Sequence, residues 1–283
     1  MDTNAPVINT AAQAALKVKI TRVETIPLNV PLHVPVKIAS GAARPAVEVM
    51  LVRLHTDQGV TGIGETQAWR REGSAETLPS LAAVINNHFA PLVTGRSPFA
   101  MNAIMRDLDA AIYHSRYAQA PISDALFDLQ GKLLGVPVHA LLGGKCRDTV
   151  ASCGVLFIQS TLAATIAGAD ALYQRGFRSF TIKVGVDPKA DVANLRALRE
   201  HFGDKAALRI DANAGTNFDD ALALLKKLEP YAIDAAEQML PIWDLAGMAE
   251  LARRVDVPLI VDECVADEHD LMSVIKHRAA TAV

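Results

Sequence analysis

The second half of the chain alternates short apolar runs with longer segments of helical periodicity. From about residue 150, apolar runs containing VLF, FTIK, RID, AAE and LIVD are separated by segments whose apolar residues recur three and four positions apart. The short runs are typical of buried strands and the longer spacing of amphipathic helices. A final run, ATAV, begins a sixth strand. Regular strand–helix alternation predicts a parallel sheet, either a (β/α) barrel or an open doubly wound sheet.

The first half of the chain has a different pattern. Alternating apolar and polar residues predict three strands of an antiparallel meander, over 18–31, 46–57 and 60–65. Residues 32–45 contain prolines and a Ser-Gly pair, which predict a loop. Helical spacing then predicts three helices, over 76–95, 97–113 and 120–135. We therefore expect three regions: a mobile tail (1–16), an α+β domain (17–145) and a partial barrel (146–283).

Composition narrows the class of protein. The formal net charge is −3 over 283 residues, which gives no basic field for nucleic acid or anionic membrane. No apolar run reaches the roughly 18 residues that span a bilayer, and we read no signal peptide at the start. Three cysteines without a CxxC pair fit a reducing cytoplasm better than a disulfide framework. We expect a cytoplasmic protein that binds neither nucleic acid nor membrane.

Charged residues stand at the ends of four predicted strands. These are Lys183, Asp211, Glu237 and Asp262, and the three acids are 26 and 25 residues apart. In parallel barrels the carboxyl ends of the strands meet at one edge, where active sites lie. Three oxygen ligands from three strands suit a hard cation, Mg²⁺ or Mn²⁺. Any one acid alone is equally explained as a helix N-cap or an exposed strand-end residue.

Neighbouring residues extend this candidate site. A lysine at the mouth of a barrel is partly desolvated, which favours its neutral form and makes Lys183 a usable base. Thr181 lies two residues earlier and shares its face. Asn213 and Gln238 follow two of the acids and either orient a ligand or cap a loop. Period-two alternation allows only one of Asp262 and Glu263 to face the site, and spacing alone does not choose between them.

Several motifs together resemble the enolase superfamily, and within it the muconate cycloisomerase (muconate lactonizing enzyme) and mandelate racemase-like proteins. The motifs occur in the order in which the family has them and span nearly the whole chain: VTGIGET, SDALFDLQGKLLGVPVHALLGG, FTIKVG, RIDANAG, AAEQML and VDE. The resemblance implies an α/β fold: a TIM-like (β/α) barrel, truncated after about six strands, with an N-terminal α+β capping domain. It also implies a homo-oligomer.

The resemblance assigns roles to individual residues. It implies that Asp211, Glu237 and Asp262 bind Mg²⁺, and it favours Asp262 over Glu263 as the third ligand. It makes Lys183, the second lysine of the family's Lys-x-Lys motif, an acid/base that removes a proton α to a carboxylate. The implied activity is that of a cycloisomerase, racemase, epimerase or dehydratase acting on a small carboxylate. Candidate substrate residues in two loops of the capping domain are Ser40, Trp69 and Arg70.

The sequence departs from the family pattern at two important places. Thr181 replaces the first lysine of Lys-x-Lys, and the sixth-strand lysine that the family uses as a second acid/base would fall beyond Val283. Two alternatives therefore accompany the enzyme hypothesis. One is a truncated, non-catalytic homologue that keeps the metal site. The other is an aldolase that forms a Schiff base through Lys183, although this gives the three carboxylates no obvious role.

Overall fold

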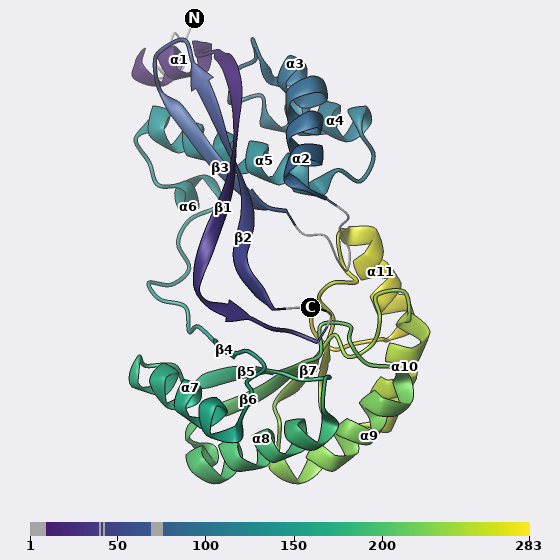
Figure 1. Ribbon diagram of the computed structural model, residues 1–283. Helices are drawn as coiled ribbons and strands as arrows, with labels where there is room; N and C mark the ends of the chain where they lie inside the picture. Colours follow the sequence, from purple (N-terminus) through teal and green to yellow (C-terminus); the bar gives the residue numbers. More distant parts are fainter. Residues whose placement is uncertain (1–9, 40, 42, 69–75) are drawn as a thin grey trace, which may run out of the picture. The chain divides into compact units, whose positions relative to one another are not determined.

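The computed structural model describes residues 10–39, 41, 43–68 and 76–283, and these form two compact units (Figure 1). Each unit has its own hydrophobic core. Of the described residues, unit 1 contains 10–31, 46–68 and 76–149, whereas unit 2 contains 32–39, 41, 43–45 and 150–283. The last division between the two units lies between Thr149 and Val150.

Unit 1 combines a three-stranded sheet, in the order β1-β2-β3, with helices. β2 and β3 pair antiparallel, as in a meander. The elements are α1 (Thr10–Lys17), β1 (Ile20–Val36), β2 (Arg44–Thr56), β3 (Thr61–Gln67), α2 (Leu78–Val84), the π-helical turn η1 (Ile85–Phe89), α3 (Ala90–Val93), α4 (Met101–Ala111), α5 (Arg116–Leu134) and α6 (Val138–Leu141). The strands and helices expected from the sequence are therefore present in the expected order.

Two glycines allow β3 to lie directly on α5. A Cβ atom at Gly62 would stand 2.2 Å from the Ala125 carbonyl oxygen, and one at Gly64 would stand 1.9 Å from the Pro121 carbonyl oxygen. No side chain fits in either space, so strand and helix pack backbone to backbone. The Gly-Ile-Gly sequence of β3 thus serves the core of unit 1.

Two expectations for the first half of the chain are wrong. Residues 32–36, expected to lie in a loop, continue β1 to Val36, and β2 already begins at Arg44. Proline has a φ compatible with extended backbone, and β1 is an edge strand, where a missing N–H group is tolerated. Residues 10–16, expected in a mobile tail, belong to α1. Its alanine-rich sequence favours a helix, and Ala15 is buried.

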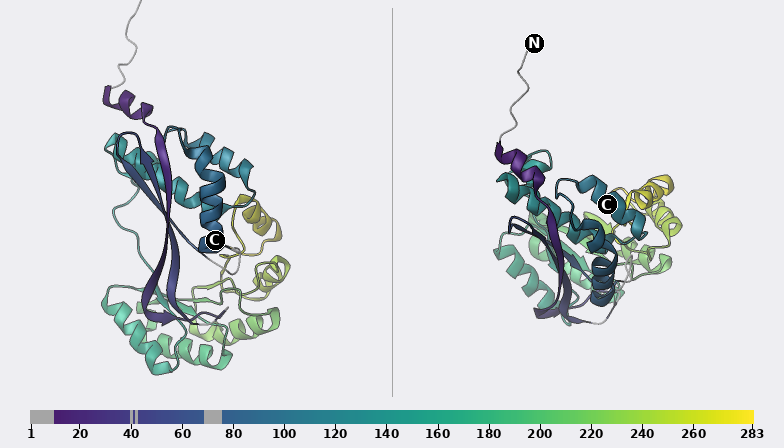
Figure 2. Two further views of the ribbon diagram at one scale, coloured as in Figure 1. Left: turned by 45° about the horizontal axis from the view of Figure 1, so that its top comes forward. Right: turned by 90° about the horizontal axis from the view of Figure 1, so that it is seen from above.

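Unit 2 contains a five-stranded parallel sheet in the order β4-β5-β6-β7-β8. Helices α7 to α10 lie along one side of this sheet (Figures 1 and 2). The elements are β4 (Gly154–Leu156), α7 (Leu162–Gln174), β5 (Ser179–Lys183), α8 (Pro188–Phe202), η2 (Gly203–Lys205), β6 (Ala207–Asp211), α9 (Phe218–Leu228), η3 (Glu229–Tyr231), β7 (Ala235–Glu237), α10 (Leu245–Arg254), β8 (Leu259–Ile260) and α11 (Glu268–His277).

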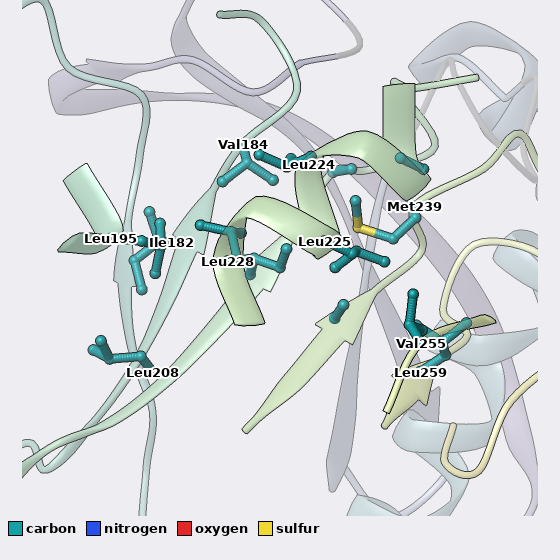
Figure 3. Packing of buried hydrophobic residues seen from close by; sticks show 14 of the residues in the cluster. Ile182, Val184, Leu195, Leu208, Leu224, Leu225, Leu228, Met239, Val255 and Leu259 are labelled. Atoms are coloured by element: carbon teal, nitrogen blue, oxygen red, sulfur yellow. The ribbon is translucent and has the colours of Figure 1, made fainter. Parts of the chain in front are cut away.

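The core of unit 2 forms between the strands and these helices. Alternate residues of β5 and β6, such as Ile182 and Leu208, are buried there with Leu195, Leu224 and Leu228 of the helices (Figure 3). Because side chains alternate along a strand, the residues between them face the other side of the sheet. That opposite side carries Thr181 and Lys183 of β5 and Asp211 of β6.

The predicted sixth strand is also visible at its start. Ala282 forms a parallel bridge with Ile260 of β8, which is the position expected for the next strand of a barrel. Among the described residues, none of the helices combines the length and the hydrophobicity needed to cross a membrane.

Candidate active site

Strand register brings three of the predicted site residues side by side. Lys183 at the end of β5 pairs in register with Asp211 of β6, and Asp211 pairs with Glu237 of β7. Glu237 is in turn opposite Ile260 of β8, and Asp262 lies two residues further along the chain. The similar spacing of these residues in the sequence therefore corresponds to one row across the carboxyl edge of the sheet.

Helix capping does not explain these strand-end acids. Each of the helices α7 to α11 begins at another residue, whose side-chain oxygen accepts a hydrogen bond from a backbone N–H group of the first turn. These residues are Thr161, Asp187, Asn217, Asp244 and Asp267. The acids of the row are therefore not the N-caps of these helices.

Asp211 is the most buried member of the row, with 1% of its side chain exposed. Its Oδ2 atom accepts a hydrogen bond from the ammonium group of Lys183 and forms an ion pair with it. Its Oδ1 atom accepts a hydrogen bond of 2.7 Å from the backbone N–H group of Asn213. Lys183 is also largely buried, with 13% of its side chain exposed. A buried carboxylate of this kind requires such partners to stay charged.

Negative charge accumulates around this ion pair. Burial, followed by the charges of Asp211 and Asp262, raises the pKa of Glu237 to about 7. Burial and the charge of Asp211 also raise the pKa of Asp262, against the opposing effect of Lys183. Carboxylates that interact in this way lie in the same electrostatic environment. One lysine does not balance them, so the row favours an additional cation.

Glu263 also belongs to this cluster, contrary to the expectation that only one of Asp262 and Glu263 faces the site. Its Oε1 atom accepts a hydrogen bond of 2.9 Å from the Asn213 side chain, and its charge contributes to the raised pKa of Glu237. Strict alternation does not apply because β8 ends at Ile260 and the chain then turns. The sequence already singled out this pair of acids, but strand periodicity was the wrong guide to it.

Gln238 supports the turn that carries these two acids. It is fully buried, and its Oε1 atom accepts hydrogen bonds from the backbone N–H groups of Asp262 (3.0 Å) and Cys264 (3.4 Å). Its Nε2 atom donates to the Leu240 carbonyl oxygen. These three hydrogen bonds connect the amide to backbone groups, so Gln238 orients the loop that carries Asp262. Among the two uses that the sequence left open for Gln238, the structure therefore favours the structural one.

Thr181 is buried on the face that carries Lys183. Its hydroxyl group lies 3.2 Å from the Cys153 sulfur, which also lies 3.4 Å from the Ser179 hydroxyl group. This position thus carries a small neutral group in contact with Cys153, the residue directly before β4. Nothing in the sequence pattern pointed to Cys153 as its partner, because the two residues are 28 positions apart.

The donor chemistry of the cluster fits a divalent cation, although the present arrangement is not a closed metal site. Within the described ranges, no three His, Cys, Asp or Glu side chains are gathered so that they could hold a metal ion. Lys183 occupies Oδ2 of Asp211. However, two oxygens nearby, Oδ1 of Asn213 and Oε2 of Glu263, are buried and have no hydrogen-bond partner within the described part of the chain. Carboxylate and amide oxygens are ligands that Mg²⁺ accepts.

The three candidate substrate residues in the loops, Ser40, Trp69 and Arg70, lie outside the described residues. Their assignment stays a prediction.

Comparison with known proteins now identifies the family. Residues 20–143 match the model of the mandelate racemase/muconate lactonizing enzyme N-terminal domain, and residues 164–283 match the enolase C-terminal domain-like model. The chain is 33% identical to muconate cycloisomerase 1 of Rhodococcus opacus, over 93% of this chain and 71% of that protein. The chain belongs to the enolase superfamily. Within the superfamily it is a muconate lactonizing enzyme/mandelate racemase-like protein.

Other enolase superfamily relatives have different activities. The N-succinyl-L-Arg/Lys racemase of Bacillus cereus is 31% identical over 94% of this chain and 71% of its own length. The crystal structure of that racemase superposes with a TM-score of 0.88 and covers 93% of this chain and 71% of the other. A dipeptide epimerase from Cytophaga hutchinsonii, solved with Mg and the dipeptide D-Ala-L-Val, has a TM-score of 0.86 at 28% identity, covering 93% and 71% of the two chains.

These similarities confirm the fold expected from the sequence. The structural neighbours are TIM-barrel enzymes of the superfamily, and unit 2 contributes the parallel strands and helices of such a barrel. Unit 1 corresponds to the N-terminal domain of the family. The named relatives are racemases, epimerases and cycloisomerases, so the chain is similar to isomerases of this superfamily.

Proposed function

We propose that this protein is a divalent-metal-dependent enzyme that removes a proton α to the carboxylate of a small substrate. The observation that carries the proposal is the register that sets Lys183, Asp211 and Glu237 in one row, with Asp262 next to it. Three carboxylates that share one environment with a single lysine suit an additional cation. The kinship with racemases, epimerases and cycloisomerases supports the reaction class.

In this proposal Asp211, Glu237 and Asp262 hold Mg²⁺, with Mn²⁺ as a substitute. When bound, the cation supplies positive charge for the substrate carboxylate and for the negative charge that develops on it as the proton leaves. The Asn213 N–H group orients the Asp211 carboxylate, and the Gln238 side chain holds the backbone at Asp262. Lys183, once its ammonium group has released a proton, is the group that accepts the substrate proton, because its nitrogen stands at the same edge of the sheet.

The reaction that follows proton removal depends on the substrate. Racemisation and epimerisation return the proton to the carbon, whereas cycloisomerisation involves a ring closure of the substrate. The neutral Thr181 gives a substrate a hydroxyl group and no positive charge at that position. Specificity is carried by loops around a common site, so the same row of residues serves all of these reactions. We therefore propose the substrate class, a small carboxylate, and not an individual compound.

Exchange of hydrogen for deuterium from solvent tests this proposal without a known product. The purified chain is incubated in deuterium oxide with a library of small carboxylates, including dipeptides and N-acylated amino acids. We expect deuterium to be incorporated at the α carbon only when Mg²⁺ is present. Mass spectrometry measures this incorporation. Exchange should stop in EDTA and in the Lys183→Ala variant.

The matched control is Lys226→Ala, because Lys226 forms an ion pair on the exposed surface of the same unit. This control should exchange like the unaltered protein. Exchange that persists in both EDTA and Lys183→Ala would overturn the assignment. A cooperatively folded chain that binds Mg²⁺ and exchanges no carboxylate would instead support the non-catalytic homologue.

A further inference from the structure

The chain turns sharply just after the strand that carries Lys183. Gly185 lies two residues beyond Lys183 and has a φ of +103°, a backbone conformation that favours glycine. Glycine has more conformational freedom than other residues, and it has no side chain that packing could hold. The turn, and with it the end of β5, therefore depends on hydrogen bonds of its backbone.

Two hydrogen bonds hold the residues that follow Lys183. The Val184 N–H group donates a hydrogen bond of 2.9 Å to the Asp211 carbonyl oxygen, which continues the pairing of β5 with β6. The Gly185 N–H group donates a hydrogen bond of 2.9 Å to Oδ2 of Asp191, in the first turn of α8. The first bond belongs to the sheet, whereas the second is accepted by a side chain. Asp191 thus connects the turn to the helix.

Capping of α8 does not account for Asp191. Asp187 is the N-cap of this helix, and its Oδ1 atom accepts hydrogen bonds from the N–H groups of Lys189 and Ala190. Asp191 is buried, and burial raises its pKa, so the charged form of this side chain is disfavoured in the fold. A buried acid at this position is therefore explained better by its bond to Gly185 than by helix stability.

We propose that Asp191 is a positioning residue for Lys183, which fixes the turn behind the lysine and so keeps the lysine nitrogen at the edge of the sheet beside Asp211. Asp191 does not touch the reacting atoms and acts through the backbone of Gly185. A misplacement of about 1 Å at a reacting group costs on the order of a hundredfold in rate. The effect on catalysis rests on the proposed function, whereas the effect on the position of Lys183 does not.

The first test follows hydrogen exchange of the Gly185 N–H group in the full chain, in Asp191→Ala and Asp191→Asn. Alanine removes the acceptor, whereas asparagine keeps an oxygen that accepts the hydrogen bond. We expect exchange to be about tenfold faster or more in Asp191→Ala and close to the unaltered rate in Asp191→Asn. Thermal melting of both variants separates this local opening from loss of the whole fold. Equal exchange at Gly185 in all three proteins would overturn the proposal.

The second test asks whether Asp191 and Lys183 act together, and it needs no activity. Free energies of unfolding are measured in EDTA for Asp191→Ala, Lys183→Met and the double variant. If Asp191 holds Lys183 against Asp211, part of the loss in Asp191→Ala comes from a weakened ion pair, which Lys183→Met has already removed. The double variant should therefore lose less stability than the sum of the two single variants.

The matched control for this test replaces Lys183→Met by Lys226→Met. Lys226 pairs with Glu229 on the exposed surface of the same unit, so its loss should add fully to that of Asp191→Ala. A strictly additive loss for Lys183→Met as well would contradict the positioning role.

The third test measures steady-state kinetics at saturating Mg²⁺, with a carboxylate that the unaltered enzyme converts. Asp191→Ala should lower kcat about tenfold or more and leave KM within about twofold, because the proposed metal ligands are not on α8. Asp191→Asn should restore most of kcat, since it keeps the acceptor for Gly185. A purely structural role would leave kcat of the folded Asp191→Ala variant unchanged, and this result would refute the proposal.

Arg199→Lys is the control for the first and third tests, because Arg199 lies toward the other end of α8. Its guanidinium group donates hydrogen bonds to the backbone carbonyl oxygens of Gly203, Ala206, Tyr231 and Ala232. This variant should melt at a lower temperature without faster local exchange at Gly185 and without a change in kcat. An unaltered protein that is inactive on every carboxylate would contradict the proposed function instead, and the first two tests would still decide the role of Asp191.

Discussion

Asp211 is the residue that ties the candidate site together. One of its oxygens is bonded to Lys183 and the other to the backbone of Asn213, and almost none of its surface is exposed. A buried charge that loses its partner is costly, whereas the same pair contributes little when it is exposed. In this structure the Lys183 ammonium group therefore stabilises Asp211. In our proposal the neutral form of the same side chain accepts the substrate proton.

We predict that Lys183→Met destabilises the protein in EDTA by about 3 kcal/mol, because it leaves Asp211 buried without a cation. Added Mg²⁺ should recover much of this loss, since a cation bound to the folded state stabilises it. Thermal melting with and without Mg²⁺ measures both effects. Lys226→Met is the control: its pair with Glu229 is half exposed, so less than about 1 kcal/mol should be lost. A variant that Mg²⁺ does not stabilise would argue against the metal site.

Among individual residues, the sequence predicted the site best where a charged residue directly ends an apolar run. Lys183, Asp211 and Glu237 end apolar runs, and each of them ends a strand in the structure. Glu263 was harder to place, because the chain has left β8 before it reaches this residue and alternation no longer indicates direction. The contact between Thr181 and Cys153 was not predictable, since it depends on the pairing of two strands and on the small size of both side chains.

Among the elements, β3 and α5 show how a glycine pattern has a structural meaning. Gly62 and Gly64 face the helix, and the carbonyl oxygens of Ala125 and Pro121 fill the space where side chains would be. The strand and the helix are adjacent only because both positions lack a Cβ atom. Propensity does not reveal such a requirement, so the sequence alone does not explain this Gly-Ile-Gly motif.

We predict that Gly64→Ala destabilises unit 1 severely, by roughly 3 kcal/mol or more, because overpacking here meets rigid backbone and not a flexible side chain. Gly168→Ala is the control. Gly168 lies inside α7, where a Cβ atom would make an ordinary 3.4 Å contact with Leu156, so alanine should be neutral or stabilise by up to about 1 kcal/mol. Chemical denaturation of both variants measures the difference. Equal stability would show that β3 and α5 do not pack as described.

Element boundaries were less predictable than the elements themselves. The loop expected over 32–45 rested partly on Pro35, and proline interrupts a central strand but not an edge strand such as β1. Similarly, α1 was missed because a short alanine-rich segment forms a stable helix only when it packs, and the burial of Ala15 is not visible in the sequence. Both differences arise from tertiary contacts that local pattern does not encode.

For the molecule as a whole, one buried acid links folding stability to pH. Asp191 of α8 is 6% exposed, and its carboxylate accepts a hydrogen bond of 2.9 Å from the Gly185 N–H group. Burial raises the pKa of Asp191 to about 6, despite that hydrogen bond, and the charge of Asp187 raises it further. The folded chain therefore keeps a proton that the unfolded chain releases near pH 4. Between these two pH values, the free energy of unfolding falls as pH rises.

We predict that Asp191→Asn removes this loss while keeping an oxygen that accepts the Gly185 hydrogen bond. The difference in the free energy of unfolding between the variant and the unaltered protein should be more favourable to the variant at pH 7.5 than at pH 4.5, by roughly 1 to 2 kcal/mol. Denaturation at the two pH values measures this gain. Asp204→Asn, at an exposed position, should change stability equally at both. A constant difference for Asp191→Asn would mean that Asp191 does not titrate as described.

The row of site residues has a consequence for how this protein tolerates changes in length. Lys183, Asp211 and Glu237 are aligned by strand register, whereas the segments between them are helices and loops. An insertion in one of those loops leaves the row unchanged, so new surroundings can arise around a constant site. A single residue inserted within β5, between Thr181 and Lys183, would turn the lysine toward the helices. Length variation among related enzymes should therefore accumulate after the strands and be rejected inside them.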